Sequence, residues 1–300
     1  MKTRMNSDSP PSLAPAESMR LLQRYSRLLV IAIIVGVSLS QMILIIGDWH
    51  LRDADAYWNA ALRLRAGEPL YPPLANSEAS EVFRYAPWFA WLWVPLTYLP
   101  HELVRVLWSM VLLAASAAAL VPLARARAWL LVAFFGFILV GISGPGNVQP
   151  LLIASLVWRL ERRSGPVWIA LAASLKVVPI LFAVTYVGRG EWKRAAVAVA
   201  LTGVLVAPML MHDLSHYPAT AGPAAGLISM PLLYAAVVAA GILVSLRASR
   251  TPFAWLASAA TVTVAVPRFF VYDISFVLAA MPSGLRLRRD PPGRGPNTPL

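Results

Sequence analysis

Long apolar runs separated by short polar segments dominate this chain of 300 residues. The first run covers residues 28–47, and others follow at short intervals almost to the C-terminus. A helix needs about 20 apolar residues to cross the hydrocarbon core of a bilayer. The pattern therefore predicts an all-α polytopic membrane protein.

The order of the runs predicts the path of the chain. Residues 85–100 are interrupted by Pro and rich in Trp, so we expect them to lie at the membrane interface or to re-enter the membrane. Residues 166–188 have basic clusters at both ends, which predicts two half-helices that meet at Lys176–Pro179, because Pro interrupts a helix. The remaining helices are expected over residues 102–123, 128–143, 151–160, 195–211, 231–246, 253–266 and 270–285.

The same pattern predicts the domain organisation. We expect residues 1–27 to be a disordered cytoplasmic N-terminus, residues 28–285 a single transmembrane domain, and residues 286–300 a disordered cytoplasmic tail. The first apolar run is too long for the core of a signal peptide and lacks a small-residue cleavage site, so we interpret it as an uncleaved helix. It delivers residues 48–85, a large first loop, to the extracytoplasmic side.

Charge and composition refine this topology. Charged residues make up 13% of the chain, against about 25% in an average soluble domain. The net charge is +12, and 19 of the 26 Lys and Arg residues lie in short loops or at the two ends of the chain. The positive-inside rule places those segments in the cytoplasm, so about eight to ten crossings of the cell membrane are expected. Nucleic acid is therefore not expected as a partner, and the absence of Cys excludes thiol chemistry.

A set of unusual polar residues falls near the predicted extracytoplasmic ends of the helices. Ionisable groups are costly in membrane segments, so each suggests a function. Each also has a simpler interpretation, as a helix cap, a solvated side chain or a long side chain that reaches the interface. The set comprises Asp53, Asp55, Arg84, Asn147, Gln149, Lys176, Arg268 and Asp273.

Asp53 is the first candidate of this set. The residues after it are compatible with a short amphipathic helix on the membrane surface, with Tyr57 on its apolar face and Gly67 at its end. Asp53 is interpreted either as the N-cap of this helix or as a general base under it. Asp55 points elsewhere, so a solvated position is expected. The two Asp residues also match the D-x-D pattern of metal-dependent sugar transferases, which is the less favoured interpretation.

Two cations and two amides complete the candidate site. Lys176, beside the predicted helix break, suits an anionic group such as a phosphate, and snorkelling to the interface is the alternative. Arg268 follows Pro267 at another helix end, where its planar fork suits phosphate oxygens or simply reaches the interface. Asn147 and Gln149 either hydrogen-bond a sugar or cap the adjoining helices. The histidines show no metal-ligand spacing, so we expect no metal and no cofactor.

Several short motifs occur in a characteristic order along the chain. They are Asp53, Tyr57, Ala60–Ala61, Gly67 and Leu70–Tyr71, then Tyr85-Ala86-Pro87, Pro95-Leu96 and Leu99-Pro100, then Gly146-Asn147-Val148-Gln149, Lys176 with Pro179, and a basic loop with Trp over residues 189–196. This order resembles that of glycosyltransferase family 87, the bacterial polyprenol-phosphate-mannose-dependent mannosyltransferases of the GT-C class. The chain departs from the family pattern in two ways: Asn147 and Gln149 are exchanged, and Ala86 replaces a Pro.

The resemblance implies a GT-C-like bundle of about 8–10 transmembrane helices, with an interfacial helix in its first extracytoplasmic loop. It implies an inverting transfer of mannose, or a related sugar, from a polyprenyl-phosphate donor to a lipid-linked glycan acceptor at the extracytoplasmic face. Asp53 is then the expected base, and Lys176 and Arg268 the expected phosphate ligands. Further expected substrate-binding residues are Asn147, Gln149, Tyr57, Arg84 and Asp55.

Two other classes of protein remain open at this stage. A transporter or lipid flippase would also contain a broken helix such as the one predicted at Lys176. A catalytically silent membrane subunit of the same fold is the other alternative, and the exchanged amides Asn147 and Gln149 favour it. Loss or retention of sugar transfer on substitution of Asp53 separates these classes.

Overall fold

The computed structural model describes residues 24–36, 51–73, 82–217, 230–267 and 269–281, and these segments contain helices and turns but no β-strand. The α-helices are α2 (Arg52–Ala66), α3 (Pro87–Trp93), α4 (His101–Arg125), α5 (Trp129–Ser143), α6 (Gln149–Arg159), α7 (Gly165–Leu175), α8 (Ala183–Gly188), α9 (Trp192–Val206), α10 (Pro231–Ala248) and α11 (Ala254–Val264). The 3₁₀ helices are η1 (Val94–Tyr98), η2 (Val178–Phe182), η3 (Ala207–Met211) and η5 (Val271–Ala280). A further helix occupies residues 24–36.

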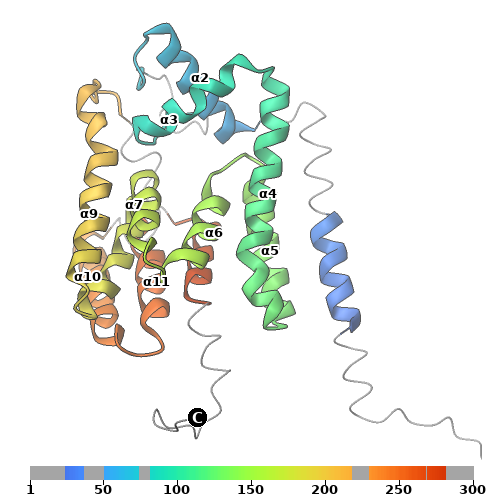
Figure 1. Ribbon diagram of the computed structural model, residues 1–300, viewed down its shortest axis with the longest axis vertical. Helices are drawn as coiled ribbons and strands as arrows, with labels where there is room; N and C mark the ends of the chain where they lie inside the picture. Colours follow the sequence, from blue (N-terminus) through green and yellow to red (C-terminus); the bar gives the residue numbers. More distant parts are fainter. Residues whose placement is uncertain (1–23, 37–50, 74–81, 218–229, 268, 282–300) are drawn as a thin grey trace, which may run out of the picture.

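Most helices run along one bundle, and α2 and α3 lie across one end of it (Figure 1). In the bundle, α4 packs against α5 and α6, α7 packs against α9, and α11 packs against α10 and η5. The helix over residues 24–36 lies beside α5, where Ile34 approaches Gly136 and the Arg27 guanidinium lies 5.4 Å from the ring centre of Trp129. We call the end crossed by α2 and α3 the α2 end.

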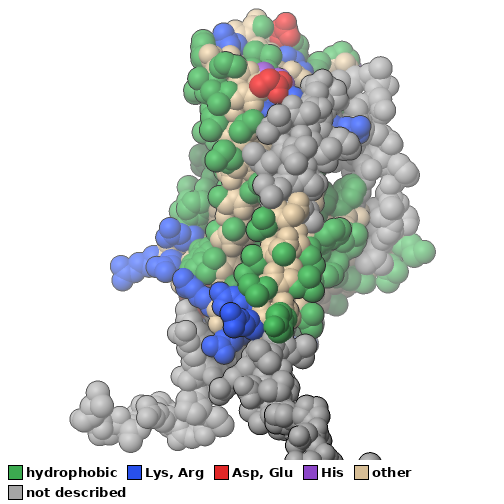
Figure 2. Space-filling view, turned by 90° about the vertical axis from the view of Figure 1, so that its right-hand side faces the viewer, with side chains coloured by type: hydrophobic (Ala, Val, Ile, Leu, Met, Phe, Trp, Pro, Cys, Tyr) green, Lys and Arg blue, Asp and Glu red, His purple; other side chains and the backbone are tan. Residues whose placement is uncertain are grey.

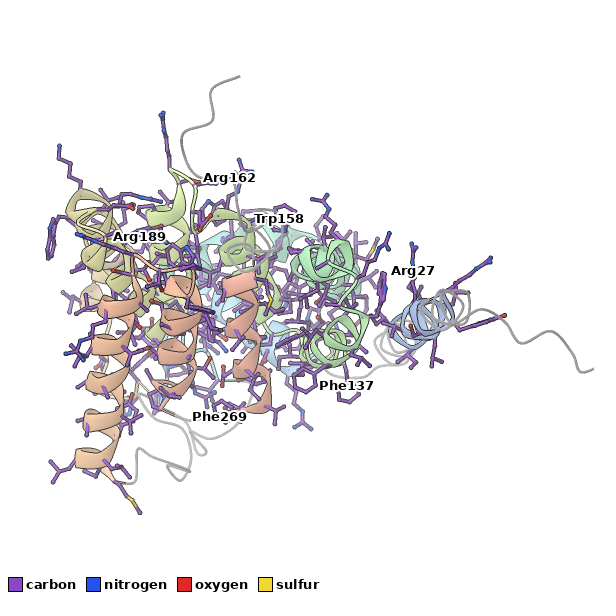
Figure 3. All side chains as sticks on the ribbon, turned by 90° about the horizontal axis from the view of Figure 1, so that it is seen from below. Arg27, Phe137, Trp158, Arg162, Arg189 and Phe269 are labelled. Carbon is purple, nitrogen blue, oxygen red and sulfur yellow. The ribbon has the colours of Figure 1, made fainter. Side chains whose placement is uncertain are left out.

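The lengths and composition of the helices fit a membrane. Three described helical segments are long and apolar enough to cross a bilayer: His101–Arg125, Trp192–Met211 and Pro231–Ala248. Shorter apolar helices, among them α5, α7 and α11, run beside them. Large apolar side chains such as Phe137 point outward from the bundle (Figure 3). The chain is therefore an all-helical polytopic membrane protein, as the sequence predicts.

The predicted break within residues 166–188 is confirmed. Helix α7 ends at Leu175, Lys176 is extended with φ −139° and ψ 99°, and η2 begins at Val178 with Pro179 at its start. Pro179 lacks the N–H that a continuous helix would need, so the chain leaves the helical path here. The two halves allow the chain to enter and leave the bundle from the same side.

Helix α2 has the C-terminal glycine and the apolar face that the sequence predicts. Its C-terminus is Gly67 in the left-handed conformation, at φ 70°, whose N–H reaches carbonyls of the last turn. Tyr57 and Ala61, on one face, are fully buried, and Leu64 packs beside them. The amphipathic helix is therefore confirmed. Its N-cap is Leu51, which has no capping side chain, so the interpretation of Asp53 as the N-cap is wrong.

The opposite end of the bundle, which we call the basic end, carries exposed Lys and Arg side chains (Figure 2). They include Arg125, Arg127, Arg159, Arg162, Arg163, Lys193, Arg247 and Arg250. Arg162 and Arg189 are labelled in Figure 3, which views the molecule from this end. The predicted clustering of basic loops on one side of the bundle is thus visible in the fold.

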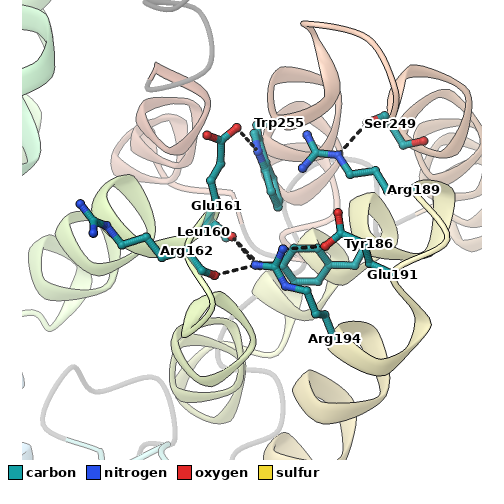
Figure 4. A network of polar contacts seen from close by, with 9 residues as sticks. All are labelled: Leu160, Glu161, Arg162, Tyr186, Arg189, Glu191, Arg194, Ser249 and Trp255. Carbon is teal, nitrogen blue, oxygen red and sulfur yellow. Dashed lines mark hydrogen bonds and ion pairs between the residues drawn. The ribbon is translucent and has the colours of Figure 1, made fainter.

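A polar network ties three loops together at the basic end (Figure 4). The Arg194 guanidinium donates hydrogen bonds to the carbonyls of Leu160 and Arg162 at 3.3 and 2.6 Å, and it forms an ion pair with Glu191 at 2.5 Å. Arg189 donates to the carbonyl of Ser249 at 2.9 Å. The α6–α7, α8–α9 and α10–α11 loops are therefore held in one arrangement.

Substitution Arg194→Lys should lower the thermal unfolding midpoint, because one ammonium cannot replace a fork that reaches two carbonyls and a carboxylate. Hydrogen bonds to charged groups contribute about 1.5–3 kcal/mol, so the expected loss is of that order. Tryptophan fluorescence during heating of the purified protein measures it. The matched control is Arg163→Lys, an exposed arginine at the same end. Equal midpoints for the two variants would contradict a stabilising role for the network.

Candidate functional site

The turn between α5 and α6 fits against the first turn of α2. The backbone N–H of Asp53 donates to the carbonyl of Pro145 at 2.9 Å. Gly146 follows with φ 84°, and a Cβ at this position would lie 2.7 Å from the Cβ of Ala54. The Trp108 indole donates to the carbonyl of Gly146 at 2.8 Å. A glycine is thus required by both the backbone angle and the close approach of α2.

This turn presents an amide to the carboxylate of Asp53. Asn147 Nδ2 donates to Asp53 Oδ2 at 2.8 Å, and Asn147 Oδ1 accepts from the backbone N–H of Gln149 at 2.9 Å. Asn147 therefore bonds α2 with its nitrogen while its oxygen caps α6. The bond to Gln149 agrees with the interpretation of Asn147 as a cap, and a hydrogen bond from Asn147 to a sugar stays a prediction.

Positive charges act on the Asp53 carboxylate from two other elements. These are Lys176, at the break after α7, and Arg84, just before α3. Burial raises the pKa of Asp53 above its ordinary value, while the hydrogen bond from Asn147 and the charges of Lys176 and Arg84 act in the opposite direction. Asp53, Arg84 and Lys176 each keep part of their surface exposed. A carboxylate with a raised pKa is better matched to proton abstraction than a solvated Asp.

Lys176 has two close partners on η5. Its Nζ lies 3.8 Å from Asp273 Oδ1 and 4.6 Å from the ring centre of Tyr272. The Lys176 side chain is 18% exposed, whereas that of Asp273 is 2% exposed. Lys176 is therefore the more exposed member of a largely buried ion pair.

Aromatic side chains pack between α2 and α3. Tyr57 is fully buried, and its hydroxyl donates to the hydroxyl of Tyr85 at 3.3 Å. Its ring also makes edge contacts with Phe89 and Trp93 of α3. Trp88 of α3 donates to Ser174 Oγ at 3.2 Å, just before the helix break. Tyr57, a predicted substrate ligand, thus lies in the packing layer, and Tyr85 is the half-buried tyrosine next to it.

Asp55 does not lie beside Asp53. Its Oδ1 is 3.1 Å from His101 Nε2 at the start of α4, and its side chain is only 15% exposed. The ring of His101 also packs against Trp58 at 4.6 Å between ring centres. The expectation of a solvated Asp55 is therefore wrong, because His101 and α4 cover it. No group of three or more His, Asp or Glu side chains within the described segments is arranged to hold a metal ion.

The remaining predicted ligands have different positions. Gln149 is fully buried, and its Nε2 donates to Ser275 Oγ at 3.3 Å, so it links α6 to η5. Arg268 lies outside the described residues. The structure thus brings Asp53, Asn147, Lys176 and Arg84 together at the α2 end, and it separates Gln149 and Asp55 from them.

The sequence analysis assigns no role to two members of the site, Asp273 and Tyr85. Asp273 belongs to the unusual polar set, but nothing in its local sequence indicates that it pairs with Lys176, which lies 97 positions earlier. Tyr85 stands in the aromatic run that resembles family 87, so its motif marks it. Its hydroxyl is adjacent to Tyr57, and the Asp53 carboxylate acts on it electrostatically.

These features define a helical membrane protein with a carboxylate and two cations at one end of its bundle. A family model described as Glycosyltransferase family 87 matches residues 83–218. This match confirms the predicted relationship to glycosyltransferase family 87 over that segment, and the family implies a membrane glycosyltransferase. The matched segment contains Arg84, Asn147 and Lys176, whereas Asp53 and Asp273 lie outside it. No curated protein and no solved structure matches the chain.

Proposed function

We propose that the protein transfers mannose, or a related sugar, from a polyprenyl-phosphate donor to a hydroxyl of a lipid-linked glycan, with inversion, at the extracytoplasmic face. The observation that carries the proposal is the half-buried Asp53 carboxylate, which accepts a hydrogen bond from Asn147 and is acted on by the charges of Lys176 and Arg84. Family 87 membership supports sugar transfer in general.

The chemistry needs one base and one stabiliser of negative charge. The acceptor oxygen attacks the anomeric carbon from the face opposite the phosphate, while the bond between that carbon and the phosphate oxygen breaks. Asp53 takes the acceptor proton, and the electron pair leaves with the polyprenyl phosphate. That leaving group is stable as an anion, so cations that offset its growing charge replace an acid. Lys176 and Arg84 are suited to this role by their position near Asp53.

The α2 end is the part of the fold that favours a lipid-borne substrate. Helix α2 lies across the bundle rather than along it, and exposed Trp91 and Leu92 belong to α3 beside it (Figure 1). Aromatic and apolar side chains of this kind occur at the level of lipid head groups. A polyprenyl donor anchored in the bilayer would present its phosphate at this level. The basic end would then face the cytoplasm, as the positive-inside rule requires.

A transport function has one supporting observation, the break at Lys176. The base and its cations lie under α2 at one end of the bundle, which suits transfer at a surface better than passage through the bundle. Purified protein in liposomes, supplied with labelled polyprenyl-phosphate mannose and an envelope lipid extract, tests both functions. Labelled glycolipid is the expected product. Movement of donor between leaflets without a new glycosidic bond would favour transport.

The substitution Lys176→Met should reduce transfer in this assay by about 100-fold or more, because loss of one preorganised charge-stabilising group commonly has an effect of that size. Lys176→Arg should retain part of the activity, since it keeps the positive charge. The matched control is Lys193→Met, an exposed lysine at the basic end, which should leave transfer unchanged. Normal transfer by the Lys176→Met protein would remove Lys176 from the mechanism.

A further inference from the structure

Asp273 is a buried carboxylate that the proposed reaction does not use. Its side chain is 2% exposed, so it is poorly placed to take a proton from a substrate. The backbone N–H of Phe270 donates to its Oδ2 at 2.9 Å, at the start of η5. One oxygen is thus fixed by the backbone, and the other, Oδ1, is directed to Lys176.

Lys176 requires such a partner because of its location. It occupies the extended link between α7 and η2, where the helical backbone is interrupted. A cation in apolar surroundings is costly unless a counter-ion accompanies it. The ring of Tyr272 lies 4.6 Å from the ammonium and adds a cation–π contact. Two consecutive residues of η5 therefore hold the same ammonium.

The pairing with Asp273 does not use all the N–H donors of the Lys176 ammonium. The distance of 3.8 Å from Lys176 Nζ to Asp273 Oδ1 is an ion-pair distance, longer than a hydrogen bond. An ammonium has three N–H donors, which a single carboxylate oxygen at that distance does not fill. Lys176 is also the more exposed partner. The carboxylates of Asp273 and Asp53 both act on it, one from η5 and one from α2.

We infer that Asp273 is a positioning residue that holds the ammonium of Lys176 near Asp53, so that its N–H donors meet the phosphate of the donor substrate. The inference rests on the proposed function, because it requires a phosphate to approach Lys176. Asp273 remains behind the ammonium throughout the reaction, and it neither accepts a proton from nor contacts the sugar. Its effect on catalysis is transmitted entirely through Lys176.

A double-mutant cycle tests this assignment. Asp273→Asn should raise the KM for the polyprenyl-phosphate donor by about tenfold or more. The substitution removes the charged partner that positions the Lys176 ammonium, so the ammonium binds the donor phosphate less well. The KM for the acceptor should not change. The double variant Asp273→Asn/Lys176→Met should be no less active than Lys176→Met alone. Multiplied losses would show that Asp273 acts independently of Lys176, and would overturn the assignment.

Further variants separate positioning from folding. Asp273→Glu keeps the charge and should recover much of the donor affinity, whereas a purely structural defect would lower the thermal midpoint without a selective change in donor KM. Asp213→Asn, the same substitution at an exposed position, is the matched control and should behave as wild type.

A binding measurement distinguishes the failure of this inference from failure of the proposed function. Quenching of tryptophan fluorescence by a short-chain polyprenyl phosphate reports binding without turnover, and Asp273→Asn should weaken it by a similar factor. Wild-type protein that transfers sugar, combined with unaltered binding and KM in Asp273→Asn, would overturn the inference alone. Wild-type protein that transfers no sugar would overturn the proposed function and, with it, this role for Asp273.

Discussion

Membranes that contain Asp53→Asn protein should transfer labelled mannose at least about 100-fold more slowly than membranes with the wild-type protein, because general-base catalysis commonly contributes about 10²–10⁴-fold. The Asn side chain is nearly the same size and can still accept a hydrogen bond from Asn147, so the fold should be preserved. What is lost is the ability to take the acceptor proton. Thin-layer separation of labelled glycolipid measures the rate, and the thermal midpoint checks the fold.

The control for this substitution is Asp55→Asn, two residues along the same helix. Its carboxylate pairs with His101 and not with Asn147. We expect Asp55→Asn to retain much more activity than Asp53→Asn, although its contact with α4 is weakened. If both variants transfer sugar at the wild-type rate, the base is not in α2 and the proposed mechanism is wrong.

The pH dependence of transfer gives an independent measure of Asp53. Burial raises its pKa, so the carboxylate becomes protonated at a higher pH than a solvated Asp would. Protonation removes the base, and the rate should therefore fall as the pH decreases through that raised value. The hydrogen bond from Asn147 favours the charged form, so Asn147→Leu should move the acid limb to still higher pH.

The second large effect is expected from Gly146→Ala. The added methyl group would lie 2.7 Å from the Cβ of Ala54 and 3.0 Å from its backbone nitrogen, so α2 must shift. A φ of 84° adds strain for any residue with a Cβ. Strain of this kind costs about 1–3 kcal/mol. Because the shift occurs one residue from Asp53, transfer should fall more than stability does.

Two glycine variants serve as controls for the Gly146 substitution. Gly141→Ala in α5 has open space around the new methyl group and an ordinary helical backbone, so it should be tolerated. Gly67→Ala has φ 70° but no atom within 4 Å, so it isolates the effect of backbone strain. Unfolding midpoints and transfer rates of the three proteins should rank Gly141→Ala, Gly67→Ala, then Gly146→Ala as the most impaired. A Gly146→Ala protein with normal transfer would show that α2 tolerates the shift.

Much of the fold can be predicted from the sequence because bilayer thickness imposes a strong length rule on apolar runs. The expected helix over residues 102–123 is α4, and the expected break at Lys176 separates α7 from η2. The ends are harder to locate. Helix α2 begins at Arg52, one residue before Asp53, and the N–H of Asp53 bonds the distant carbonyl of Pro145, a tertiary contact that no local pattern reveals.

The candidate site could be predicted less completely, because it too depends on tertiary contacts. The costs of burying charge indicate which residues are unusual, and this is how Asp53 and Lys176 stand out. The partners of those charges are set by the packing of elements far apart in the sequence. Asn147 contacts Asp53 across 94 positions, while Gln149, two residues later, contacts Ser275 instead. The spacing of the two amides in the sequence does not indicate that Asn147 bonds Asp53 and Gln149 bonds Ser275.

Helices α9 and α10 have little protein around them: only 11% of the apolar window in Trp192–Met211 and 6% of that in Pro231–Ala248 is buried. Within the described chain, α9 packs mainly against α7 and α8, and α10 packs against α11 and α8. In a bilayer, acyl chains must supply the dispersion contacts that the polypeptide leaves unmade. The annular lipid is therefore part of the structure of this half of the molecule, and its chain length and order bear directly on how firmly these two helices are held.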